Sequence, residues 1–199
     1  MTAARQAILL ALGPHFESDV AGALEGASYA VSVISTETIA GIEDERELAE
    51  LLKADPEALV AGDGIFPRTL DQDRALEAGL RRLFIACKCV TRSMMRRRFG
   101  RVVAIAPESA AGFVPSAAAL GSVGGLMKSI AREVGTRGIT ANVIAPGRVD
   151  GSGDMSRYVA VGRLAQPRDI SSVVGFLVGD SSAYITGQIL AVDGGLTTA

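Results

Sequence analysis

Short continuous apolar runs alternate along the chain with stretches in which apolar residues recur every three or four positions. The first pattern is typical of strands buried on both faces of a parallel sheet, and the second is typical of amphipathic helices. Strands are predicted over residues 7–12, 28–35, 57–62, 101–106, 139–145 and 188–192. Helices are predicted over residues 16–25, 43–54, 71–99, 117–135 and 168–178. This alternation predicts a doubly wound three-layer α/β sandwich around a mainly parallel sheet of about six strands.

Composition narrows the classes of function. With 199 residues the chain is long enough for one substantial core, and we assign residues 1–199 to a single domain. A net charge of −2 disfavours nucleic acid as a partner, because a phosphate-binding face needs an excess of basic residues. No apolar stretch approaches the roughly 18 residues of a membrane span, and the N-terminus does not resemble a signal peptide. We therefore expect a cytoplasmic protein that does not bind membranes.

Residues that commonly bind metals are scarce. His15 is the only histidine, and Cys87 and Cys89 are the only cysteines. Two residues apart on a predicted helix, these cysteines point in different directions, so they suit neither a metal cluster nor a disulfide framework. We expect two ordinary thiols at core or surface positions, and no metal site.

Three segments of the second half carry a family resemblance. They read RSMMRRRFGRVVAIA, GGLMKSIAREVGTRGITANVIAPGRVD and GRLAQPRDISSVVGFLVGDSSAYITGQILAVDGG. In this order they resemble the short-chain dehydrogenase/reductase family, and in particular its 3-oxoacyl thioester reductase branch. The resemblance covers residues 70–199 closely and residues 1–69 only in outline. It implies a Rossmann-like fold, a nicotinamide cofactor and hydride transfer.

The turn after the first predicted strand is where the resemblance would place the cofactor phosphates. In the family this turn is G-x-x-x-G-x-G, whose glycines let backbone amides approach a pyrophosphate at a helix N-terminus. With the first glycine on Gly13, the other two positions are Glu17 and Asp19. A carboxylate about 4 Å from a phosphate charge costs about 4 kcal/mol at an effective dielectric constant near 20. We expect Glu17, Ser18 and Asp19 to satisfy the free helix amides instead, and no cofactor-binding residue in this chain.

The resemblance also implies a catalytic tyrosine followed four residues later by a lysine. Counting back from KSIARE places the tyrosine position on Ser116 and the lysine position on Leu120. No tyrosine in the chain has a lysine four residues later; the three tyrosines are Tyr29, Tyr158 and Tyr184. We therefore expect no catalytic residue of the family type.

Other family features are also changed. The catalytic asparagine position falls on Gly79, and the catalytic serine position falls near Pro107, with Ser109 two residues away. The chain has room for only one further strand between its first strand and residues 57–62, so we expect one edge strand to be lost relative to the family. Residues 146–162 are shorter than the lid that covers the substrate in the family.

These substitutions favour the hypothesis of a catalytically inactive, cofactor-free subunit, a pseudoenzyme when isolated. Its partner would be an intact short-chain dehydrogenase subunit in a heterodimer or heterotetramer, with NAD or NADP in that partner. The branch implies a hydroxyacyl or oxoacyl thioester as the substrate of the complex. In the family the two long helices, the last helix and the last strand pack subunits together. The interface residues expected on this basis are Leu83, Val90, Met94, Val123, Met127, Ile130, Phe176, Tyr184 and Val192.

Two other functions remain open. The chain could be a homo-oligomeric binding or regulatory protein that holds a small molecule in its cleft. Alternatively, it could be a self-sufficient oxidoreductase with an altered site, in which Ser109 or Tyr158 donates the proton. Nucleotide binding by the isolated chain would favour the oxidoreductase, and a stable homo-oligomer without a dehydrogenase partner would favour the binding protein.

Overall fold

The computed structural model describes residues 4–13, 16–40, 42, 44–53, 55–66, 71–107, 114–149 and 156–198. Its strands are β1 (Arg5–Leu10), β2 (Tyr29–Ile34), β3 (Ala58–Ala61), β4 (Gly100–Ile105), β5 (Ile139–Pro146) and β6 (Ile189–Val192). Its helices are α1 (Glu17–Gly26), α2 (Thr36–Ala40), α3 (Glu45–Leu51), α4 (Gln72–Arg97), α5 (Val114–Val134) and α6 (Pro167–Val178).

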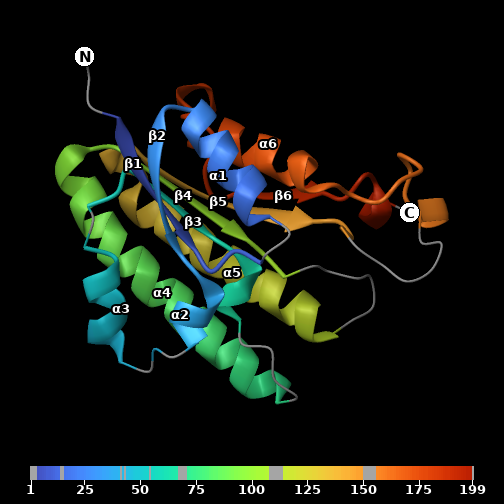
Figure 1. Cartoon of the computed structure of the whole chain (residues 1–199), viewed down its shortest axis with the longest axis horizontal. Coiled ribbons are helices and arrows are strands. Elements are labelled where there is room, and N and C mark those ends of the chain that lie inside the picture. The colour runs from blue at the N-terminus through green and yellow to red at the C-terminus, as the bar shows by residue number, and fades with distance from the viewer. Residues whose placement is uncertain are drawn as a thin grey trace.

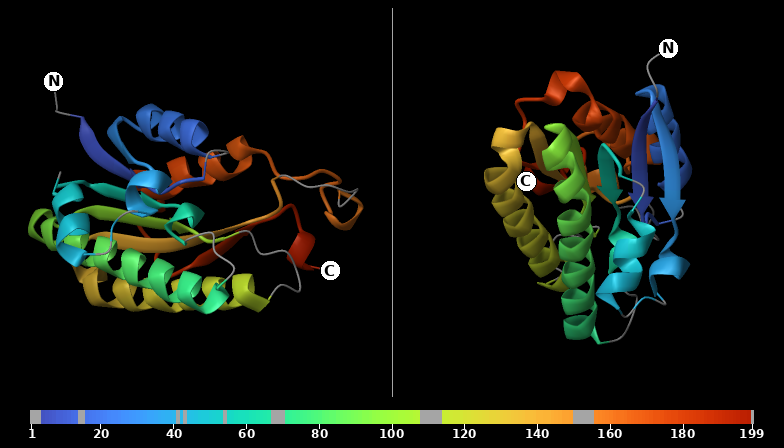
Figure 2. Two further views of the ribbon diagram at one scale, coloured as in Figure 1. Left: turned by 60° about the horizontal axis from the view of Figure 1, so that its bottom comes forward. Right: turned by 90° about the vertical axis from the view of Figure 1, so that its left-hand side faces the viewer.

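The strands form one fully parallel sheet of six, in the order β2-β1-β3-β4-β5-β6 (Figure 1). Helices α1 and α6 pack together over one face, and α3, α4 and α5 cover the other (Figure 2). The predicted doubly wound, three-layer α/β architecture is confirmed. No helix in the described part of the chain is both long and apolar enough to cross a bilayer.

The continuous apolar runs correspond to strands that are buried on both faces. Every residue of β3, β4 and β5 is buried. Alternate residues of each strand contribute to two separate hydrophobic clusters, one under α3, α4 and α5 and one under α1 and α6. A parallel sheet needs helices on both faces for this reason, because its side chains point alternately to either side.

The strand order reverses at β1. The chain leaves β1 to form β2 on one side and later returns to form β3 on the other, so that β1 pairs in parallel with both. The connections that follow β1 and β3 therefore separate at the carboxyl edge of the sheet, which is the usual position of a ligand site in open α/β sheets. This topology selects the region after β1 and β3 as the place to look for a site.

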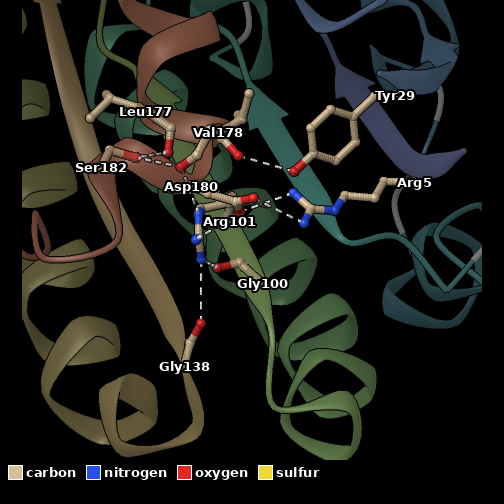
Figure 3. A network of polar contacts seen from close by, with 10 residues as sticks. Arg5, Tyr29, Gly100, Arg101, Gly138, Leu177, Val178, Asp180 and Ser182 are labelled. Carbon is tan, nitrogen blue, oxygen red and sulfur yellow. Dashed lines mark hydrogen bonds and ion pairs between the residues drawn. The ribbon is translucent and has the colours of Figure 1, made fainter. Parts of the chain in front are cut away.

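The opposite, amino edge of the sheet is joined by polar contacts (Figure 3). Arg5 donates from its two terminal guanidinium nitrogens to the carboxylate oxygens of Asp180, at 3.1 and 3.3 Å. The Tyr29 hydroxyl donates to the backbone oxygen of Val178 at 3.0 Å. The buried Arg101 donates from its Nε to the backbone oxygen of Gly179 at 3.5 Å. These contacts attach β1, β2 and β4 to the C-terminal end of α6 and the turn that follows it.

Most element boundaries agree with the sequence to within two or three residues. The short helix α2 was not predicted, and the helix expected over 43–54 is the shorter α3. Asp44 caps α3 by accepting from the Arg46 backbone N–H at 3.0 Å, which explains where the helix begins. The helix α5 starts at Val114, three residues before the predicted start at Ala117.

Two glycine substitutions test how tightly β1 and β3 are joined at the carboxyl edge. A Cβ on Gly62 would lie 2.6 Å from the Leu12 Cα and 2.7 Å from the Ala11 oxygen, and backbone atoms cannot easily move away. We expect Gly62→Ala to lower the free energy of unfolding by about 1–3 kcal/mol, measured by urea denaturation.

Gly22→Ala is the matched control, because Gly22 lies within α1 and a Cβ there would meet nothing within 4 Å. We expect this variant to gain roughly 0.5–1 kcal/mol from helix propensity. Equal unfolding midpoints for the two variants would contradict the close packing of the β1 and β3 ends.

Candidate functional site

The turn after β1 is closed by a carboxylate from the turn after β3. The Gly13 backbone N–H donates to Asp63 Oδ1 at 3.3 Å. The same oxygen would lie 3.3 Å from a Cβ built on Gly13. The side chain of Asp63 is thus placed directly over the first glycine of the turn that the sequence singled out.

The glycines after β3 allow this close approach. A Cβ on Gly64 would lie 2.4 Å from Thr36 Oγ1 and 2.6 Å from the Ala11 oxygen. Thr36, the first residue of α2, donates from its hydroxyl to the Leu12 backbone oxygen at 3.4 Å. The space between the ends of β1, β2 and β3 is therefore occupied by the chain's own backbone and by the side chains of Asp63 and Thr36.

The start of α1 differs from the sequence expectation. The residue that caps the helix is Phe16, whose N–H donates to the Gly13 oxygen at 3.0 Å, and no side chain caps the helix. The expectation that Glu17, Ser18 and Asp19 satisfy the free amides is wrong. The residue in the capping position is a phenylalanine, which has no side-chain oxygen to accept a helix amide.

The residues after β1 do not fit the pyrophosphate of a dinucleotide. The Gly13 amide, which a phosphate would need, already donates to the carboxylate of Asp63. Glu17 and Asp19 add two acids at the helix start, where a bound phosphate needs neutral or positive surroundings. Asp63 was not among the residues predicted for the site; its signal in the sequence is the stretch A-G-D-G at the end of a buried strand, where two glycines flank one carboxylate.

The expected catalytic positions are now placed in the fold. Leu120 is half-buried and packs against the hydrophobic cluster under α4 and α5. Gly79 lies on α4 where a Cβ would approach the Phe66 ring to 2.1 Å, so an asparagine does not fit there without repacking. Ser116 lies on α5, and Ser109 is outside the described residues.

Tyr158 is the only one of the two expected proton donors that the structure describes. It lies in the connection between β5 and α6 and is 53% exposed. The Arg157 guanidinium donates to the Tyr158 hydroxyl at 3.0 Å and lies 4.8 Å from the ring centroid. The remaining tyrosines are distant from this connection, since Tyr29 bonds to Val178 and Tyr184 follows α6.

An ion pair fixes the end of the connection that leads into α6. Arg163 donates to both carboxylate oxygens of Asp169, at 2.6 and 2.9 Å. Asp169 also accepts the backbone N–H of Gln166 at 2.8 Å, at the start of the helix. Hydrogen bonding from Arg163 is the main cause that lowers the pKa of Asp169 to about 2.

The expected interface residues divide into two groups. Five of them are buried in the core of this chain, namely Leu83, Val90, Met94, Val123 and Met127. The expectation that they contact a partner is corrected, because α4 and α5 turn these side chains toward the sheet and toward each other. On α4 the exposed apolar residue is the neighbouring Phe84, which is 52% exposed.

The other four expected interface residues remain accessible to some extent. Phe176 is 43% exposed and Tyr184 is fully exposed. Ile130 and Val192 are half-buried. Their role at an interface stays a prediction.

The cysteines and the histidine contribute no described site. Cys87 is buried within α4, and burial raises the pKa of its thiol to about 12. Cys89 is half-buried. Among the described residues no group of His, Cys, Asp and Glu could hold a metal ion, and His15 lies outside them.

Comparison with known proteins identifies many relatives. A family model described as enoyl-(acyl carrier protein) reductase matches residues 68–197. The 3-oxoacyl-[acyl-carrier-protein] reductase FabG of Pseudomonas aeruginosa is 32% identical, over 88% of this chain and 78% of that protein. FabG of Vibrio cholerae is 39% identical, over 61% of this chain and 55% of its own. FabG of Salmonella typhimurium is 37% identical, over 69% of this chain and 63% of its own length. The matches to the Vibrio and Salmonella proteins therefore span less than two thirds of those proteins.

A solved structure shares the fold. It is an oxidoreductase of the short-chain dehydrogenase/reductase family from Burkholderia thailandensis, with a TM-score of 0.84. The superposition covers 100% of this chain and 94% of that chain at 22% sequence identity.

These findings overturn one expectation from the sequence. The inference that the isolated chain is not an enzyme is wrong, because the relatives that align over most of it are named as reductases. That inference treated each altered position separately and gave the similarity of the whole chain too little weight.

The pair of Arg163 and Asp169 predicts how stability changes in acid. The pKa of Asp169 is lower in the folded protein, about 2, than the ordinary value of about 3.9 in an unfolded chain. The pair therefore stabilises the fold fully above pH ~4, and this contribution disappears as the pH falls toward ~2.

We expect urea midpoints of the parent protein to fall over this range more steeply than those of Asp169→Asn, which cannot ionise. Asp73→Asn, an exposed carboxyl in the first turn of α4, serves as the control. Parallel curves for the parent and Asp169→Asn would show that the pair does not act on stability.

Proposed function

The chain belongs to the short-chain dehydrogenase/reductase family, and we propose that it is one subunit of an oligomeric oxidoreductase that interconverts 3-oxoacyl and 3-hydroxyacyl thioesters. The names of its relatives, which are 3-oxoacyl-[acyl-carrier-protein] reductases, support the substrate class. The observation that carries the subunit role is the set of large apolar side chains left exposed in the part of the chain that matches the family.

Tyr158 and Val161 of this set lie in the connection between β5 and α6, and the other four lie on or between helices and the last strand. On α4, Phe84 is 52% exposed. On α6, β6 and the turn between them, Phe176, Tyr184 and Ile189 are 43%, 102% and 39% exposed. Aromatic side chains are enriched at contact surfaces between proteins, where each removes a large apolar area from water. All four residues fall within the matched residues 68–197.

In this proposal the partner is an intact short-chain dehydrogenase subunit, in a heterodimer or heterotetramer, and it holds the NAD or NADP. The contact of Asp63 with the Gly13 amide supports this assignment of the nucleotide, because it occupies the phosphate-binding turn of the present chain. The surface formed by α6 and β6 would contribute to the assembly beside the partner's substrate pocket.

A second candidate has its own support. The named reductase activity of the relatives and the Arg157–Tyr158 contact favour an oxidoreductase that acts alone, with the Tyr158 hydroxyl as proton donor. For this candidate, a nucleotide has to bind without the Gly13 amide, because that amide donates to Asp63.

Native mass spectrometry of the protein purified gently from its host separates these candidates. We expect an assembly with a second chain of dehydrogenase mass, with nucleotide retained only on that chain after mild dissociation. A nucleotide on every copy of the present chain would favour the self-sufficient oxidoreductase. A homo-oligomer without nucleotide would favour a binding or regulatory protein.

Surface variants test where the partner binds. We expect Phe84→Glu and Tyr184→Glu each to reduce recovery of the second chain at least tenfold, because a charge replaces a buried aromatic contact. Leu51→Glu on α3 is the matched control, since Leu51 is 40% exposed but lies outside the matched residues. Undiminished recovery with both aromatic variants would contradict the proposed surfaces.

A further inference from the structure

One margin of the sheet, at β2, is an unpaired strand edge. β2 pairs in parallel with β1 over six residues and has no other neighbour among the described strands (Figure 2, right). The Ala11 N–H donates to the Ile34 oxygen at 2.8 Å, so the backbone of Ile34 faces β1. Backbone groups of alternate residues in a strand point to the same side. The N–H and C=O groups of Val33, Val31 and Tyr29 therefore point away from β1.

Within the part of the chain that the structure describes, this edge shows no feature that blocks strand pairing. Its sequence, YAVSVI, has no charged residue and no proline, and its register with β1 continues without a bulge. Val33 is 46% exposed although it is β-branched and apolar. Natural proteins usually block such edges with lysine, proline, a bulge or a covering segment, because an open edge is a template for a further strand.

Both ends of the edge strand are attached to the rest of the fold. Tyr29 is buried, and its hydroxyl donates to the backbone oxygen of Val178, which connects the first residue of β2 to the end of α6 (Figure 3). The side chain of Ile34 is buried at the other end of the strand. A strand that is fixed before binding loses little conformational entropy when another strand pairs with it.

The stretch of sequence that contains β2 is rich in acids, whereas Arg5, beside Tyr29 on β1, is paired with Asp180. From residue 17 to residue 50 the chain has nine acids and one base, Arg46. The acids are Glu17, Asp19, Glu25, Glu37, Glu43, Asp44, Glu45, Glu47 and Glu50. Two of them flank β2 directly: Glu25 is at the end of α1 and Glu37 is in α2, and both are exposed.

We propose that the outer edge of β2 binds an extended segment of another protein as an added strand, with basic residues on both sides of an uncharged core. The open backbone groups select an extended strand, and the acids at both ends of β2 select basic flanks. A second copy of this chain is disfavoured. In a two-fold symmetric antiparallel pair, the start of one β2 lies beside the end of the other, which brings Glu25 of each copy toward Glu37 of its partner.

This surface is separate from the α4 and α6 surfaces of the proposed subunit role, so the two proposals can fail independently. The probe is a fluorescent nine-residue peptide with a Val-Thr-Val-Thr-Val core between two lysines at each end. A second peptide has glutamates in place of the lysines. A third keeps the lysines but has N-methyl groups on alternate core residues, which removes the amide donors of one edge, and a fourth has the N-methyl groups on the other alternate residues.

Binding is measured by fluorescence anisotropy on the full chain, and amide hydrogen exchange locates the site. We expect the lysine peptide to bind at least tenfold more tightly than the glutamate peptide and than one of the two N-methylated peptides. It should also slow exchange at the amides of Val31 and Val33. Equal binding of the lysine peptide and both N-methylated peptides would overturn the proposal, because it would show attraction by charge without strand pairing. No binding, or dimerisation that protects the same amides without peptide, would also overturn it.

Variants of the chain add an independent check. We expect the double variant Glu25→Gln and Glu37→Gln to weaken binding of the lysine peptide about fivefold, while Glu133→Gln on the distant helix α5 leaves it unchanged. Val31→Pro removes an outward amide, and proline is tolerated on the open side of an edge strand. If Val31→Pro folds and still binds with unchanged affinity, the proposal is wrong. If Val31→Pro does not fold, the variant with both Glu25→Gln and Glu37→Gln is the test, and unchanged binding of the lysine peptide by it contradicts the proposal.

Discussion

The pairing of β1 with strands on both of its sides is the constraint on which the rest of the structure depends. Because β1 bonds to β2 on one side and to β3 on the other, the segments that follow β1 and β3 part at the same edge of the sheet. Their backbones then lie so close that Gly62 and Gly64 have no room for a Cβ. The carboxylate of Asp63 is brought onto the Gly13 amide by this same geometry.

The two halves of the chain carry different functional features. The matched residues 68–197 include α4, α5, α6 and β6, which carry the exposed aromatic surfaces. The first part of the chain holds the altered turn and the acidic, open margin at β2. In the proposed assembly the second half contacts other subunits, and the first half carries the features that differ from the family pattern.

Much of the fold follows from the sequence, because uninterrupted apolar runs have few alternatives to a strand buried on both faces. The interface was harder to predict. Leu83 and Phe84 are neighbours on α4, and the helical spacing of apolar residues does not say which of the two faces the chain's own core. The structure buries Leu83 and exposes Phe84. The contact between Asp63 and Gly13 joins residues fifty positions apart, so the A-G-D-G stretch marks a carboxylate at a strand end but does not identify its partner.

The inference of inactivity failed for a different reason. It rested on the lack of a tyrosine with a lysine four residues later, which is a property of a few positions, whereas the similarity to named reductases covers 88% of the chain in one alignment. The prediction for the start of α1 was wrong for a local reason. Phe16 occupies the capping position, whereas the side chains of Glu17, Ser18 and Asp19 were expected to accept the free helix amides.

The most direct test of the account is a titration of the isolated, isotopically labelled chain with NADPH and with NADH, followed by the amide resonance of Gly13. Because Gly13 already donates to Asp63, we expect no saturable shift at Gly13 or at the first turn of α1 with either nucleotide. A saturable shift of the Gly13, Glu17 and Asp19 amides would show that this turn binds the cofactor, and the assignment of the nucleotide to a partner would be wrong.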